Sequence, residues 1–225
     1  MSIRSTAIFA VATTISNACA VQAPVESEVS TQDPRPNIVL IVADDLGFAD
    51  LGNFGSDIRT PHIDALAAEG MRFTQFHTAT MCAPTRAMLL SGNNNHVAGV
   101  GRQSPTPLMQ AHLPGYEGYL SERVAKLPAL LREAGYHTYM AGKWHLGRGP
   151  EHGPGMAGFE RSFVMLDGAG SHFDNRGFGV GSSEYREDGE SIEWPEGAYS
   201  TELYTDRLID FIEENRGDGR PFFLY

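Results

Sequence analysis

Residues 37–45 read NIVLIVADD, an uninterrupted β-branched and aliphatic run that ends in two aspartates. Apolar runs of this length without polar alternation are typical of parallel strands that are buried on both faces of a sheet. Further strands and helices alternate along the chain after it. The sequence therefore predicts an α/β fold with a mostly parallel sheet flanked by helices.

Asp44 and Asp45 follow this predicted strand directly. Two adjacent carboxylates at the end of a buried strand are costly unless they bind a cation or accept backbone donors. The carboxyl ends of strands are also where open α/β sheets form their ligand crevice. Paired carboxylate oxygens suit Ca²⁺, or less well Mg²⁺, rather than zinc. The alternative is that one aspartate only caps a turn with Gly47.

Residues 82–92 read CAPTRAMLLSG and are the second segment whose residues indicate a functional site. Pro84 favours the first turn of a helix, so Cys82 is expected at a helix N-terminus, where the helix dipole attracts anions. Arg86 lies one turn further on the same face, and Gly92 is expected to end the helix. The pattern indicates a reactive sulfur beside an anion site; the alternative is a buried structural cysteine.

Lys143 and His145 follow a predicted strand at residues 136–141. Alternation along the extended chain places them on one side and Trp144 on the other, which makes a small anion site able to move a proton. His172 follows a turn rich in glycine and alanine, where the backbone can approach a ligand closely. The alternatives are a solvated lysine with an incidental histidine, and a plain loop histidine.

Several other elements are expected from periodicity and from helix-start and helix-stop residues. They are a core-packed helix at 60–70 with Ile63 and Leu66 inside, a mixed strand at 71–77, a helix from Pro128 to 135, an irregular hairpin region at 174–199, an amphipathic helix at 200–215 and a buried strand at 221–225. The segment 102–118 is rich in Pro and Gly and is expected to run over the surface near the substrate mouth.

The N-terminus resembles an export signal. A positive start, a short apolar run and the small-residue pattern around Cys19 predict a signal peptide at residues 1–20, which implies a periplasmic or secreted protein. Lipidation of Cys19 is the alternative. The apolar run is too short for stable membrane insertion. Residues 21–35 are read as a flexible lead-in and residues 36–225 as the folded domain, with Cys82 as its only cysteine.

The composition of the chain limits the classes of molecule that it can bind. The chain has 225 residues, of which 41% are hydrophobic, and a net charge of −11. It is therefore long enough to bury a core, and the absence of a basic cluster argues against nucleic-acid binding.

The motifs described above resemble those of the sulfatase family, and most closely the bacterial arylsulfatases of the alkaline phosphatase superfamily. Three segments carry the resemblance, in this order along the chain: Asp-Asp-Leu-Gly at 44–47, Cys82-x-Pro84-x-Arg86 with its Leu-Ser-Gly tail, and Gly-Lys-Trp-His at 142–145. In this family the cysteine is converted to formylglycine by a formylglycine-generating or anaerobic maturation enzyme.

The resemblance implies hydrolysis of a small-molecule sulfate ester. The hydrated aldehyde derived from Cys82 would attack sulfur while Lys143, Arg86 and Ca²⁺ hold the negative oxygens. Asp44, Asp45 and the converted Cys82 would bind the metal. His172 would assist the leaving oxygen, and His145 the release of sulfate.

Two other functions remain open on sequence grounds. A formylglycine-dependent phosphonate monoester or phosphodiester hydrolase would use the same nucleophile, because phosphate and sulfate are both tetrahedral. A non-catalytic binding role is disfavoured because a binding module has no need of a convertible cysteine. Similar sulfatases add an Asp-Asn pair and a lysine from a later segment, so we expect residues 36–225 to be an incomplete, C-terminally truncated domain and this fragment to be inactive.

Overall fold

The computed structural model describes residues 35–178 and 181–225, which all belong to one compact unit. The predicted signal peptide at 1–20, with Cys19, and all but the last residue of the lead-in at 21–35 lie outside the described residues. Within the described part, no helix is both long enough and apolar enough to cross a membrane.

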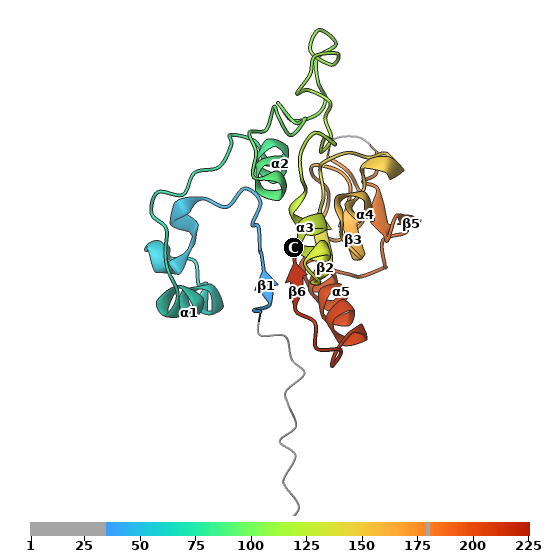
Figure 1. Cartoon of the computed structure of the whole chain (residues 1–225). Helices are drawn as coiled ribbons and strands as arrows, with labels where there is room; N and C mark the ends of the chain where they lie inside the picture. The colour runs from blue at the N-terminus through green and yellow to red at the C-terminus, as the bar shows by residue number, and fades with distance from the viewer. Residues whose placement is uncertain (1–34, 179–180) are drawn as a thin grey trace, which may run out of the picture. The chain divides into compact units, whose positions relative to one another are not determined.

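A six-stranded sheet in the order β1-β6-β2-β3-β4-β5 is the centre of the fold (Figure 1). The first four strands in this order are parallel, and β4 and β5 form an antiparallel hairpin at one edge. The mostly parallel sheet predicted from the sequence is therefore confirmed. The strands are β1 Ile38–Val39, β2 His137–Lys143, β3 Arg161–Met165, β4 Tyr185–Glu187, β5 Glu190–Ile192 and β6 Phe222–Leu224.

The helices pack on this sheet or lie beside it. They are α1 Pro61–Glu69, α2 Cys82–Ser91, α3 Leu127–Glu133, α4 Pro154–Ala157 and α5 Ser200–Glu214, with 3-10 turns η1 Phe48–Asp50, η2 Gly52–Phe54 and η3 Pro150–His152. The predicted helices at 60–70, 82–92, 128–135 and 200–215 are thus present. Gly92 ends α2 in the left-handed conformation, with φ of +66°, as expected for a C-terminal glycine.

Two hydrophobic clusters cover the two faces of the sheet. Because successive side chains of a strand point to opposite faces, Tyr139 packs in one cluster and Met140 in the other. The Tyr139 cluster includes the apolar stripe of α5 around Phe211. The Met140 cluster includes the inner face of α2, where Ala87 and Leu90 are fully buried. This double coverage explains why the first four residues of β2 are all buried.

β6 lies between β1 and β2 although it is the last strand in the sequence. It pairs in parallel with both, through Ile38 opposite Phe223 and His137 opposite Phe222. The prediction of a buried strand at 221–225 is confirmed, and β6 joins the N-terminal strand to the rest of the sheet.

The region before α2 departs from the predictions. Only Ile38–Val39 is a strand, and it is an edge strand: within the described residues, β1 pairs with β6 alone. Val39 is 58% exposed and Ile41 83% exposed, so the expected burial on both faces is wrong. The reason is that an apolar run becomes a buried strand only where neighbours cover both of its faces.

Two further expectations fail in the same region. Ile63 and Leu66 of α1 are exposed, so this helix does not pack into the core as predicted. Residues 71–77 form no strand, and their Phe73 and Phe76 are exposed. Local pattern predicted the helix correctly but not its burial, which depends on what packs against it.

Candidate active site

The site forms where α2 begins and where β1 and β2 end. Cys82 is the first residue of α2, so its side chain lies at the positive end of the helix dipole. Lys143 is the last residue of β2, and Asp44 follows β1. The structure therefore brings these three side chains together, since Nζ of Lys143 lies 3.2 Å from Sγ of Cys82 and 2.8 Å from Oδ2 of Asp44.

Asp44 holds two cations together. Its Oδ2 accepts a hydrogen bond from Nη2 of Arg86 at 2.7 Å and lies 2.8 Å from Nζ of Lys143. Burial raises the pKa of Asp44, but hydrogen bonds from Lys143 and Arg86 outweigh this effect and hold the pKa below its usual value. The carboxylate is therefore ionised at neutral pH and fixes both cations.

Arg86 is almost fully buried, with 4% of the residue exposed. Its Nη1 donates to the backbone oxygen of Lys143 at 2.6 Å and to the hydroxyl of Tyr225 at 3.3 Å. Its Nε is buried and has no partner among the described residues. A guanidinium held by three side-chain or backbone groups is a rigid positive charge behind Cys82.

Three side chains surround the sulfur of Cys82. Nζ of Lys143 lies 3.2 Å from Sγ, and Nδ1 of His145 lies 3.4 Å from it. Oε1 of Gln103 is also 3.4 Å away. The sulfur thus has an ammonium, an imidazole and an amide within hydrogen-bonding distance, as a nucleophile with an adjacent base and cation requires.

His145 is placed by an unusual backbone. Its φ is +57°, a conformation that non-glycine residues rarely adopt. Burial, followed by the charges of Lys143 and Arg86, lowers the pKa of His145 to about 4. The imidazole is therefore neutral at pH 7 and able to accept a proton from a group at the Cys82 position. Trp144, between the two site residues, is buried on the opposite side as predicted.

Asp45 also has a left-handed backbone, with φ of +57°, and is exposed. Within the described part of the chain, its carboxylate and Oδ1 of Asp44 accept no hydrogen bond. Free carboxylate oxygens at the end of a strand are the donors that Ca²⁺ prefers.

The predicted metal ligands do not form a complete site by themselves. In residues 35–178 and 181–225, no group of three or more His, Cys, Asp or Glu side chains is arranged to hold a metal ion. Asp44, Asp45 and Cys82 therefore are not assembled as a three-ligand cluster. The two carboxylates fit one side of a hard-cation site in donor chemistry.

His172 is not part of the Cys82 cluster. Its Nδ1 lies 2.6 Å from Oγ of Ser200, the first residue of α5, and its ring lies beside Tyr199. None of its contacts with the described residues reaches Cys82, Lys143 or His145. The proposed contact of His172 with a leaving oxygen stays a prediction.

Two residues at the site were not predicted from the sequence. Gln103 belongs to the Pro- and Gly-rich segment that was expected near the substrate mouth, but no pattern singled out this glutamine. Tyr225 was predicted only as part of an apolar strand. Both reach the site through contacts with residues far away in the sequence, Cys82 and Arg86, which no local spacing indicates.

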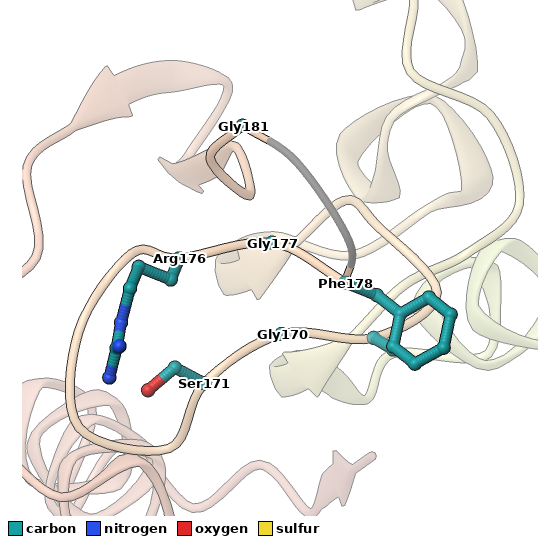
Figure 2. A pocket seen from close by; sticks show the side chains of 7 residues that line it. Gly170, Ser171, Arg176, Gly177, Phe178 and Gly181 are labelled. Carbon is teal, nitrogen blue, oxygen red and sulfur yellow. The ribbon is translucent and has the colours of Figure 1, made fainter.

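A cavity of about 550 Å³ lies beyond the end of β3. Figure 2 shows its wall, in which the side chains of Ser171, Arg176 and Phe178 stand out among glycines.

The chain has similar proteins of known family. The family model described as Sulfatase matches residues 36–225. An uncharacterized sulfatase of Schizosaccharomyces pombe is 43% identical over 210 residues, which cover 86% of this chain and 37% of the relative. An arylsulfatase of Klebsiella aerogenes is 40% identical over 204 residues, which cover 87% of this chain and 43% of the relative.

Solved structures agree with this assignment. The crystal structure of Ps i-CgsB superposes with a TM-score of 0.72 at 31% identity and covers 84% of this chain and 44% of that one. The chain spans about two fifths of the length of the curated relatives described above. The match of the family model over residues 36–225 and the conserved architecture show that this chain belongs to the sulfatase family.

Proposed function

We propose that the protein containing this chain hydrolyses sulfate esters with a formylglycine made from Cys82. The observation that carries the proposal is the arrangement around the sulfur: Lys143 and His145 lie within 3.4 Å of it, at the N-terminus of α2. In the converted residue, the position of Sγ would be taken by an oxygen. Once hydrated, formylglycine supplies two hydroxyls on one carbon, one to attack sulfur and one to release sulfate.

The residues of the chain have separate roles in this proposal. Lys143 would bind a sulfate oxygen, since its ammonium faces the nucleophile and is held in place by Asp44. Arg86 would supply a buried positive charge that stabilises the negative charge developing in the transition state. His145, neutral because its pKa is about 4, would accept the proton of a hydroxyl at the Cys82 position.

Asp44 and Asp45 would hold a calcium ion, with the oxygen of the converted Cys82 as a further ligand. Support comes from their free carboxylate oxygens. Such an ion supplies additional positive charge for the sulfate oxygens. Mg²⁺ is the less suitable ion because it demands near-ideal octahedral geometry.

The substrate is proposed to be a small sulfate ester on a carbohydrate or an aryl group. One relative is named an arylsulfatase. Another similar solved structure, 29% identical with a TM-score of 0.64, is described in complex with its substrate D-glucosamine-2-N,6-O-disulfate. A formylglycine-generating or anaerobic maturation enzyme is the proposed partner, and the export signal predicted at residues 1–20 would place the mature protein in the periplasm or outside the cell.

The test uses the longest natural polypeptide that contains residues 1–225, co-expressed with a formylglycine-generating enzyme. The mass of the tryptic peptide that carries Cys82 should be lower than that of the thiol form, and the peptide should react with a hydrazide. Preparations with a higher converted fraction should turn over an aryl sulfate proportionally faster. A fully alkylatable thiol in active protein would contradict the proposal.

The same preparation separates the two hydrolase functions. Parallel assays with an aryl sulfate and an aryl phosphodiester compare kcat/KM directly, and a higher value for the phosphodiester would replace sulfatase by phosphodiesterase. Cys82→Ala is the control, and it should remove turnover of both substrates because no other described side chain provides the nucleophile.

A further inference from the structure

Gln103 touches the Cys82 sulfur, yet the proposed mechanism gives it no role. Its Oε1 accepts a hydrogen bond from Sγ of Cys82 at 3.4 Å. The residue lies in the loop after α2 and is partly buried. Its Nε2 has no hydrogen-bonding partner within residues 35–178 and 181–225. The hydrogen bond with Cys82 is therefore the contact that gives this side chain a function to explain.

The backbone just before Gln103 is firmly held. Nδ2 of Asn95 donates to the backbone oxygens of Val100 at 3.1 Å and of Gly101 at 3.2 Å. The N–H of Gly101 donates in turn to the oxygen of Gly115 at 2.6 Å. Val100 is buried in the hydrophobic cluster that includes the inner face of α2. Because Gln103 follows this anchored segment by two residues, its amide is held near the sulfur.

The three groups around the sulfur differ in whether they donate or accept hydrogen bonds. The ammonium of Lys143 can only donate. A neutral imidazole such as that of His145 has one donor and one acceptor nitrogen. Oε1 of Gln103 can only accept. An atom at the position of Sγ is therefore matched to its surroundings only if it carries a proton that it can donate to Gln103.

This requirement separates the two forms of formylglycine. In hydration, the oxygen of a water molecule bonds to the carbonyl carbon and one water proton moves to the carbonyl oxygen; two hydroxyls result, and nothing is oxidised or reduced. A hydroxyl can donate to Oε1 of Gln103. The aldehyde oxygen has no proton, so it would face Oε1 as a second acceptor and leave both unsatisfied.

We propose that Gln103 accepts a hydrogen bond from one hydroxyl of the hydrated formylglycine at position 82. It thereby favours the hydrate, which contains the nucleophile, over the aldehyde. The inference rests on the proposed formylglycine function and adds a further residue to the catalytic site. Lys143 and His145 keep the roles described above.

The test uses the matured full-length protein labelled with carbon-13 at Cβ of cysteine, which becomes the carbonyl carbon. NMR distinguishes hydrate from aldehyde at this carbon and gives their ratio without turnover. In Gln103→Met, a side chain of similar length without a strong acceptor, the hydrate-to-aldehyde ratio should fall about three- to tenfold, as expected for the loss of one neutral hydrogen bond. Hydroxylamine, which reacts with the aldehyde alone, should form the oxime faster by a similar factor.

Two further variants are controls. Gln103→Glu keeps an acceptor oxygen at the same distance from the backbone, so its hydrate-to-aldehyde ratio should be at least that of the wild-type protein. Gln110 lies in the same loop, and its side chain makes no hydrogen bond with the described residues. Gln110→Met should therefore match the wild-type protein in this ratio and in kcat/KM. Thermal unfolding checks that all variants are folded.

The outcomes separate this inference from the proposed function. An unchanged ratio and oxime rate in Gln103→Met would overturn the inference, and so would an equal fall of the ratio in Gln103→Glu. If residue 82 of the wild-type protein stays a thiol, both the inference and the proposed function fail. If it is converted but no sulfate ester is cleaved, only the proposed function fails, because the ratio still decides the role of Gln103.

Discussion

The two ends of β2 carry charged clusters of similar composition but different character. At the amino end, Nδ1 of His137 lies 2.8 Å from Glu160, and its Nε2 lies 2.6 Å from Asp218. At the carboxyl end, His145 and Lys143 face the sulfur of Cys82. Each cluster contains a histidine, carboxylates and an arginine; His137 is buried and His145 is partly buried.

The difference lies in how much hydrogen-bonding capacity remains. At the amino end, both nitrogens of the imidazole face carboxylates, and Arg220 also lies 3.6 Å from Glu160. At the carboxyl end, Oδ1 of Asp44 and the carboxylate of Asp45 accept no hydrogen bond from the described residues and keep capacity for a ligand or a metal. A saturated cluster holds the fold together, whereas an unsaturated cluster can bind and react.

Lys143→Ala should give the largest effect and tests the carboxyl end directly. Loss of a cation that faces developing negative charge typically costs about 3–4 kcal/mol, so we expect kcat/KM to fall about 100- to 1000-fold. Both a higher KM and a lower kcat are expected, because sulfate is held before and during the reaction. Steady-state kinetics on an aryl sulfate measures this.

Lys126→Ala is the matched control for Lys143. Lys126 is also a buried lysine and pairs with a carboxylate, Glu122, but it lies outside the site. The kcat/KM of Lys126→Ala should match that of the wild-type protein. An unchanged kcat/KM in Lys143→Ala would remove this lysine from the site.

The two aspartates after β1 should behave differently. Asp44→Asn should lower the free energy of unfolding by about 1–3 kcal/mol as well as activity, because the buried Arg86 loses its charged partner. Asp45→Asn should change stability by less than about 0.5 kcal/mol, because Asp45 is exposed, and should weaken calcium binding. Urea denaturation and calcium titration calorimetry measure the two effects. Equal stability of the two variants would show that Asp44 does not hold Arg86.

His137→Gln tests the amino end. An amide cannot satisfy both carboxylates, so we expect a loss of about 1–2 kcal/mol in the free energy of unfolding. Activity should remain within about twofold once the protein is folded, since the cluster lies at the opposite end of β2 from the site. His62→Gln, at an exposed position of α1, should leave stability unchanged. A loss of kcat at full folding would mean that the two ends of β2 are coupled.

Tyr139→Phe should give the smallest effect, a change in the free energy of unfolding that is seen only at alkaline pH. Burial, despite the hydrogen bond that its hydroxyl accepts from Asn215, raises the pKa of Tyr139 to about 12. Because this pKa is higher in the folded than in the unfolded state, the associated stability is complete below about pH 10 and is lost as the pH rises through about 12. The absorbance of tyrosinate measures the ionisation of Tyr139 as the pH rises, and the free energy of unfolding at each pH measures the loss of stability. In Tyr139→Phe, this component of the pH dependence should be absent; an unaltered alkaline transition would assign it to other tyrosines.

Local spacing predicted how the candidate site residues lie within their own segments, whereas their chemical roles came from the resemblance to the sulfatases. A helical turn separates Cys82 from Arg86, and strand alternation separates Lys143 and His145 from Trp144, so neighbouring residues alone fix these relations. The same reasoning predicted α5 and its apolar stripe. It did not predict burial for residues 38–77, where many apolar side chains are exposed.

The sequence by itself thus determined most of the helices and strands, the position of Cys82 at a helix N-terminus and the choice of most candidate site residues. Only the tertiary structure decided that Asp44 binds both Arg86 and Lys143, that Gln103 and Tyr225 reach the site, and that β6 separates β1 from β2. The reason is physical: helix and strand periods act over a few residues, whereas burial, strand order and charge pairing depend on segments that are distant in the chain and meet only after folding.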